Sequence, residues 1–209
     1  MRNATAVCRR SGMLVLAVLA TFSAPGQSQA PPEPPMSAEQ KAQMEAWMKV
    51  MTPGKPHQEM ATKVGVWEGT VSMWDAPGAP PQVNQARAER TMGLGGRVLI
   101  DHWKGTMMGM PFEGMGMSGY DNANGKSWST WSDSFTTGLM TSSGKCDPDP
   151  KKGCDFSGNY VDSRTGKDKQ NRSTVSWPSA DEERMEMFEI GADGKEWKNM
   201  EIVIRRAKK

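Results

Sequence analysis

The chain has few of the residues from which catalytic and cofactor sites are usually built. Its 209 residues include only two histidines, His57 and His102, and three cysteines. It has no G-x-S-x-G, P-loop or H-E-x-x-H motif, and no glycine-rich loop that joins a strand to a helix. The sequence therefore predicts no catalytic residues and assigns no cofactor.

Long apolar runs are also absent beyond the N-terminus, so we expect no membrane-spanning segment in the mature chain. The first 30 residues instead have the pattern of an export signal. Arg2, Arg9 and Arg10 precede the short apolar stretch 13–20, and Ser28-Gln29-Ala30 offers a small-x-small cleavage site. We therefore predict that residues 1–30 are a signal peptide and that the protein is periplasmic or secreted.

Strong charge of either sign is missing from the mature chain. The predicted signal contains three arginines and no acidic residue, so its removal leaves 23 basic and 24 acidic residues and a net charge of −1. A nearly neutral chain gives no reason to expect nucleic acid or an anionic membrane as a partner.

Two cysteines remain after the signal, Cys146 and Cys154, and they flank the turn-rich segment DPDPKKG. In an oxidising compartment this spacing favours a disulfide that ties two neighbouring strands. A metal site would need further ligands, and no histidine lies in this stretch.

A proline-rich linker over 31–36 is followed by a predicted helical segment over 37–63. Ser37 and Gln40 form a capping box, and Pro53-Gly54 ends the first helix. One apolar stripe with helical spacing runs along this helix, and we expect it to pack against one end of the following domain. The stripe consists of Met44, Trp47, Met48 and Met51.

From residue 64 to residue 206 the apolar period changes from helical to alternating. Apolar and polar residues alternate over 65–73 and again over 199–206. Between these segments the pattern predicts strands over 84–92, 97–106, 112–120, 126–135, 138–146, 154–161, 168–177 and 183–190. Short connections make neighbouring strands antiparallel, and a sheet this wide closes on itself. The predicted fold is all-β, a single antiparallel up-and-down barrel of about ten strands with an N-terminal helix.

Particular residues of this barrel resemble known families. Gly65-x-Trp67 on the first strand and Arg206 on the last resemble the lipocalin-type (calycin) signature, in which the arginine covers the tryptophan at the closed end of the barrel. The segments 105–114, 119–122 and 193–196 resemble a bacterial family of unknown function, number fifteen-seventy-nine. This resemblance implies a lipocalin-like barrel, structural roles for Gly65, Trp67 and Arg206, and no established activity.

Leucine, isoleucine and valine are scarce, whereas methionine (18) and tryptophan (8) supply much of the apolar volume. Methionine is a soft side chain that suits an adaptable cavity, and it equally suits the gaps of a packed core. The leading hypothesis is that the barrel binds a small apolar or amphipathic molecule, and the alternative is a packed structural or protein-interaction module. The candidate ligand-binding residues are Trp67, Met73, His102, Met108, Met115, Met117 and Trp131.

The methionines also permit a metal hypothesis. Thioether sulfur is a ligand that Cu(I) prefers, so Met107, Met108 and Met110 together with His102 form an alternative copper site. Haem ligation by His102 is a further alternative, and it requires that this side chain point into the barrel.

Overall fold

The structure is a computed structural model that describes residues 35–163, 165–191 and 194–208. The predicted export signal lies outside the described residues. Ala38–Met51 form helix α1 and Lys55–Ala61 form helix α2. Among the described residues no helix has the length and apolar character needed to cross a membrane.

The apolar stripe of α1 does not pack against the barrel, contrary to the sequence expectation. Every residue of this helix is exposed, and Trp47 retains 58% of its accessible surface. Its C-terminal end is held, because the side chains of Arg97 and Asn122 donate hydrogen bonds to the carbonyls of Met51 and Val50. Side-chain donors of this kind satisfy the carbonyls that a helix end leaves unpaired.

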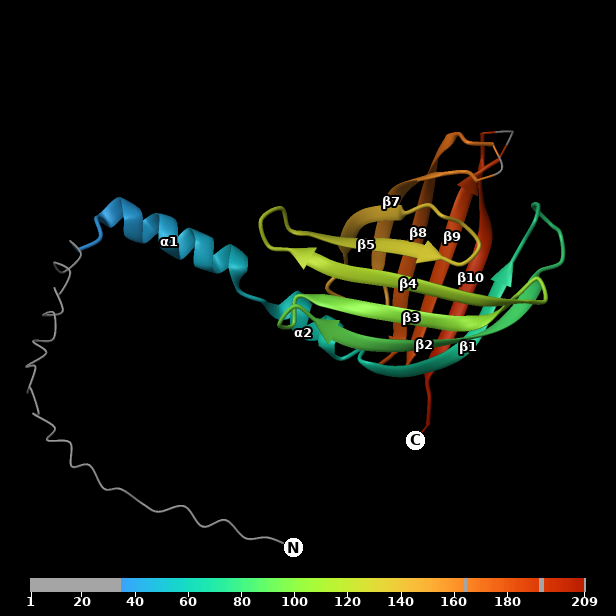
Figure 1. The fold of residues 1–209 in the computed structure, drawn as a ribbon, viewed down its shortest axis with the longest axis horizontal. Coiled ribbons are helices and arrows are strands. Elements are labelled where there is room, and N and C mark those ends of the chain that lie inside the picture. The colour runs from blue at the N-terminus through green and yellow to red at the C-terminus, as the bar shows by residue number, and fades with distance from the viewer. Residues whose placement is uncertain (1–34, 164, 192–193, 209) are drawn as a thin grey trace, which may run out of the picture. The chain divides into compact units, whose positions relative to one another are not determined.

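Ten strands follow the helices (Figure 1). They are β1 (Gly65–Met73), β2 (Gln82–Gly93), β3 (Val98–Met107), β4 (Met110–Asp121), β5 (Lys126–Asp133), β6 (Met140–Cys146), β7 (Cys154–Val161), β8 (Asp168–Ser179), β9 (Glu182–Ile190) and β10 (Glu196–Arg206). Each strand pairs antiparallel with its neighbours in sequence, and β1 pairs with β10, so the sheet closes into a barrel. The predicted fold class is therefore confirmed. In Figure 1, β2 to β5 cross the front and β8 to β10 run steeply behind them.

Glycines occur where the backbone of a neighbouring strand lies too close for a side chain. A Cβ atom added at Gly69 would lie 2.0 Å from the Val203 carbonyl oxygen on β10, and one added at Gly144 would lie 1.9 Å from the Asp155 carbonyl oxygen on β7. No side chain fits at such a distance, so these two positions require glycine.

The register of the strands shows which side chains face the interior. Trp67, Ala88 and Ile204 are completely buried, and they form a cluster with Trp103. Because side chains alternate along a strand and paired residues share a face, every other residue from these positions faces inward, except where the register shifts between Lys198 and Met200 on β10 and between Ser176 and Ser179 on β8.

The predicted disulfide is confirmed, since Cys146 and Cys154 are bonded and occupy paired positions at the ends of β6 and β7. The bond closes the short connection between these strands.

We expect that replacing both Cys146 and Cys154 by serine lowers the free energy of unfolding by about 2–3 kcal/mol, because the short loop is no longer constrained in the unfolded chain. Urea unfolding of the oxidised protein and of the double variant measures this difference. An unchanged unfolding midpoint would contradict the prediction.

Candidate functional site

A buried ionic network lies at the end of the barrel where β1 begins. The Arg90 guanidinium donates to both carboxylate oxygens of Glu183, at 2.7 and 2.8 Å, and its Nε atom donates to Asp101 at 2.5 Å. All three residues are more than 90% buried. Trp177 Nε1 also donates to Glu183, at 2.9 Å. We call Arg90, Asp101, Glu183 and Trp177 the closed-end network.

Trp67 lies between two arginines at the same end. The guanidinium carbon of Arg90 is 5.2 Å from the centre of its ring, and that of Arg206 is 4.5 Å away. Guanidinium groups are attracted to the face of an indole ring, most strongly where water is excluded. The structure thus has the tryptophan–arginine pair that the lipocalin-type resemblance implies.

Arg206 also connects the last strand to the segment after α2. Its two terminal nitrogens donate to the carbonyls of Thr62 and Val64, at 2.8 and 2.7 Å. The indole nitrogen of Trp67 donates to the carbonyl between them, that of Lys63, at 2.8 Å. These bonds fix the chain that leads from α2 into β1, and they close this end of the barrel.

The carboxyl groups of the network have opposite pKa shifts. Burial raises the pKa of the Asp101 carboxyl above its ordinary value, and its contact with Arg90 offsets this only in part. Burial acts in the same direction on Glu183, but the two hydrogen bonds and the charge of Arg90 outweigh it, so the pKa of Glu183 is lowered. The bidentate contact accounts for the difference between the two acids.

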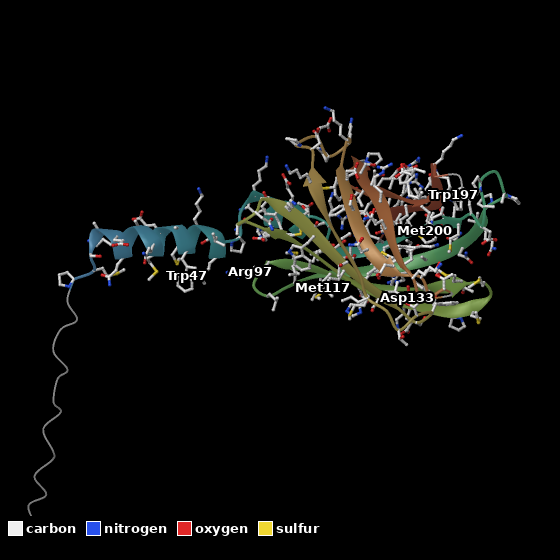
Figure 2. All side chains as sticks on the ribbon, turned by 90° about the horizontal axis from the view of Figure 1, so that it is seen from above. Trp47, Arg97, Met117, Asp133, Trp197 and Met200 are labelled. Atoms are coloured by element: carbon white, nitrogen blue, oxygen red, sulfur yellow. A yellow bond between two sulfur atoms is a disulfide. The ribbon has the colours of Figure 1, made fainter. Side chains whose placement is uncertain are left out.

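Away from the closed end, the inward side chains are only half-buried. The apolar ones are Met73, Met107, Phe112, Trp131, Met140, Phe156, Met185, Met187, Trp197 and Met200. Small residues occupy many of the other inward positions on β4 to β8, including Gly116, Ser118, Ser129, Ser142 and Gly158. We call this half of the interior the chamber. In Figure 2, the labelled side chains of Asp133, Trp197 and Met200 belong to strands that line it.

An aromatic cluster forms one side of the chamber. Trp131 meets Trp103 edge-on and stacks with Phe112, with ring centres 6.2 and 6.4 Å apart. The indole nitrogen of Trp131 donates to Asp133 at 2.9 Å. A Cβ atom added at Gly114 would lie 2.4 Å from the Trp131 ring, so a glycine on β4 makes room for this tryptophan.

The structure divides the predicted ligand-binding residues between two faces. Trp67, Met73 and Trp131 face inward, and Trp67 is sealed within the closed end. The others are exposed, and they are His102, Met108, Met115 and Met117. His102 pairs with Met115, and both lie on the outer face because their neighbours Trp103 and Gly114 face inward. The prediction that these four residues line the interior is therefore corrected.

The alternative copper ligands are not gathered at one point either. Met108 and Gly109 form the turn between β3 and β4, with backbone φ angles of 52° and 75°. Met107 and Met110 pair across this turn, whereas His102 lies five residues away on the opposite face of β3. An exposed His102 on the outer face is also not placed to bind haem inside the barrel. In the described part of the chain, no three His, Cys, Asp or Glu side chains are arranged to hold a metal ion.

Sequence reasoning did not find the closed-end network. Arg90 lies on the same inward face of β2 as Ala86 and Ala88. A charged residue at an inward position needs a buried partner, so its position was a signal of a buried ion pair. Its partner Glu183 is 93 residues away, and no local pattern connects the two.

Two surface clefts accompany the interior. One of about 170 Å³ lies beside the end of α1 and is lined by His57, Tyr120 and Trp128. The buried His57 accepts a hydrogen bond from the Gly54 backbone through Nδ1 and meets Tyr120 edge-on. The other cleft, of about 340 Å³, lies on β7 to β10.

We expect Glu183→Ala to lower the free energy of unfolding by about 3–5 kcal/mol, because it leaves the buried charge of Arg90 without its principal partner. The matched control is Glu182→Ala, which removes an exposed pair with Arg205 and should cost no more than about 1 kcal/mol. Equal losses in denaturant unfolding of the two variants would contradict a dominant role for the buried network.

The two buried acids should affect acid stability with opposite signs. Because the folded-state pKa of Glu183 is lowered, its contribution is present above its ordinary pKa of 4.5 and is lost as the pH falls through the folded value. The raised pKa of Asp101 instead favours the folded state on acidification.

Unfolding free energies measured between pH 7 and pH 3 should therefore fall less steeply in Glu183→Gln than in the wild type, and more steeply in Asp101→Asn. Parallel curves for all three proteins would show that the network does not titrate with folding.

Comparison with one solved structure agrees with this architecture. The solved structure of Rv2717c from M. tuberculosis matches with a TM-score of 0.56 and 12% identity, over 75% of this chain and 100% of that one. A redesigned β-barrel matches with a TM-score of 0.39 and 15% identity, over 72% of this chain and 96% of that one. No curated protein matches in sequence. A family model matches residues 52–206, and the chain belongs to the family described as protein of unknown function (DUF1579).

Proposed function

We propose that this protein binds a small amphipathic molecule in the chamber of its barrel. The observation that carries the proposal is the contrast between the two halves of the interior. At the closed end, Trp67, Ala88 and Ile204 retain no accessible surface. In the chamber, inward methionines such as Met187 and Met200 remain half-buried, although the wall of the barrel surrounds them.

The side chains of the chamber suit a ligand with an apolar body. Methionine adapts to irregular shapes, and aromatic rings such as that of Trp131 supply a large contact area. Some inward residues are small, including Ser129 and Ser142, whose hydroxyl groups are hydrogen-bonded to each other, and they occupy less of the interior than larger side chains would.

The polar groups of the chamber favour a neutral or cationic polar end. Asp133 and Glu189 both face inward. Asp133 accepts hydrogen bonds from the Trp131 indole and from the backbone amides of Phe135 and Thr136, and Glu189 accepts one from Tyr160. These carboxylates repel an anion, while each retains acceptor capacity for a hydroxyl or an ammonium group.

The proposal includes a location outside the cytoplasm. The arginine-rich start and short apolar stretch of the first 30 residues support export. The Cys146–Cys154 disulfide is typical of an oxidising compartment.

The test is titration of the oxidised protein with N-phenyl-1-naphthylamine, a neutral fluorescent probe that brightens in apolar surroundings. We expect saturable binding by the wild type and at least a tenfold weaker affinity in Met200→Lys, because a charge then lies in the chamber. Met115→Lys is the matched control, since Met115 lies on the outer face and is 49% exposed.

Equal binding by both lysine variants would place the probe outside the chamber and contradict the proposal. Thermal unfolding of both variants shows whether a loss of binding reflects the site or the fold. Absence of saturable binding in the wild type would favour a barrel without a ligand.

A further inference from the structure

The pairing between β8 and β9 closes the barrel but does not extend over the full length of the two strands. Their pairing runs from Ser179 and Glu182 up to Arg172 and Phe188, where it ends. Beyond that point residues 168–171 of β8 pair only with β7, and residues 189–190 of β9 pair only with β10. We call this parting of the two strands the split.

The larger surface cleft lies at the split. Its volume is about 340 Å³, and its lining includes Arg172 and Phe188, the last residues to pair. These two belong to the outer face, whereas Asn171 and Gly158, which also line it, belong to the inner face. The cleft therefore opens on the outer surface and reaches into the wall at Asn171 and Gly158.

Side-chain contacts among the described residues cross the split, including one on each face that passes over an intervening strand. On the outer face, Arg172 of β8 donates two hydrogen bonds of 2.8 Å to Glu196 of β10. On the inner face, Tyr160 of β7 donates to Glu189 of β9 at 3.0 Å. Side-chain contacts of this kind break and form without loss of the backbone pairing on either side.

The closed arrangement of the split leaves one polar atom unsatisfied. Asn171 is 7% exposed, and its Nδ2 atom donates to the sulfur of Met140 at 3.4 Å. Its Oδ1 atom is buried and has no hydrogen-bond partner in the described part of the chain. A buried acceptor without a donor is unfavourable. When the split opens, water or a donor group can bind this oxygen, and the hydrogen bond formed there offsets part of the free energy that opening costs.

We propose that the wall opens between β8 and β9 and that the ligand enters the chamber through the split, an inference that rests on the proposed function. Asn171 is the first residue of β8 beyond the last pair, and Met140, which it contacts, faces the chamber. The split therefore leads directly to chamber residues.

The lining of the split fits the ligand class proposed for the chamber. The amides of Gln170 and Asn171 offer hydrogen bonds to a polar end. Phe188 and Ile190 offer apolar contact to the rest of the molecule, and Ile190 is 61% exposed. An amphipathic molecule finds a partner for each end along this path.

The opening itself is tested without any ligand, by amide hydrogen exchange of the full oxidised chain. We expect residues 169–171 and 189–190 to exchange at least tenfold faster than residues 173–176 and 184–187, which are paired within the same two strands. Arg172→Gln should increase exchange at the split a further several-fold, because it removes the outer contact. Equal protection of the two regions would overturn the opening.

The route is tested by closing the split covalently. If the pairing of β8 with β9 continued beyond Arg172 and Phe188, Gln170 would lie opposite Ile190. Both residues are exposed. In the test protein, Gln170→Cys and Ile190→Cys are combined and a short bismaleimide cross-links the two new cysteines. In the matched control, the cross-link joins the cysteines of Thr174→Cys and Glu186→Cys, because Thr174 and Glu186 are paired on the same two strands. The same cysteines capped singly with N-ethylmaleimide control for modification alone.

Stopped-flow mixing with N-phenyl-1-naphthylamine measures the result. We expect cross-linking at the split to slow both association and dissociation at least tenfold with little change in affinity, while the control cross-link leaves both rates unchanged. Unchanged rates after cross-linking at the split would show that the probe enters elsewhere and would overturn the route. If the wild type binds no probe, the proposed function and the route both fail, and hydrogen exchange alone decides whether the split opens.

Discussion

One buried guanidinium joins the two sides of the barrel. Arg90 on β2 binds Asp101 on the adjacent β3 and Glu183 on β9, which is separated from β2 by β1 and β10. Loss of Arg90 leaves both carboxylates buried without a counter-charge, and loss of Glu183 removes the bidentate partner of the buried guanidinium; both changes are costly at low local dielectric. The network therefore joins strands that do not touch through their backbones, and it lies at the sealed end of the barrel, away from the chamber where we place the ligand.

Most of the strand pattern was predictable from the sequence, because alternation and turn residues act locally. The face that each strand turns inward was less predictable in β4. In Gly114-Met115-Gly116-Met117 the expectation that apolar side chains face the interior placed the methionines inside. The structure turns the glycines inside, because Trp131 on β5 lies over them and needs the space that a Cβ atom would take. The side chain of a neighbouring strand thus decided the orientation, and no pattern within β4 contains that information.

The contacts that define the interior were beyond the reach of the sequence for a related reason. The bond between Arg90 and Glu183 joins residues 93 positions apart, and the contact of Tyr160 with Glu189 crosses an intervening strand. Trp67 and Arg206 were found only because a resemblance to a family pointed to them. For α1 the helical spacing was right, but spacing alone does not supply a surface to pack on, and Trp47 remains exposed.

The split has a consequence for the solubility of the protein. A closed barrel has no free strand edge, and exposed edges are where sheets of different molecules join and aggregate. At the split, residues 168–171 and 189–190 form two edges within the wall. Both are short, and Asp168, Lys169 and Glu189 place charges along them. Short length and charge are the features by which edge strands resist pairing with another molecule. The pairing of the wall therefore stops at the split without offering an edge to which strands of a second molecule can add.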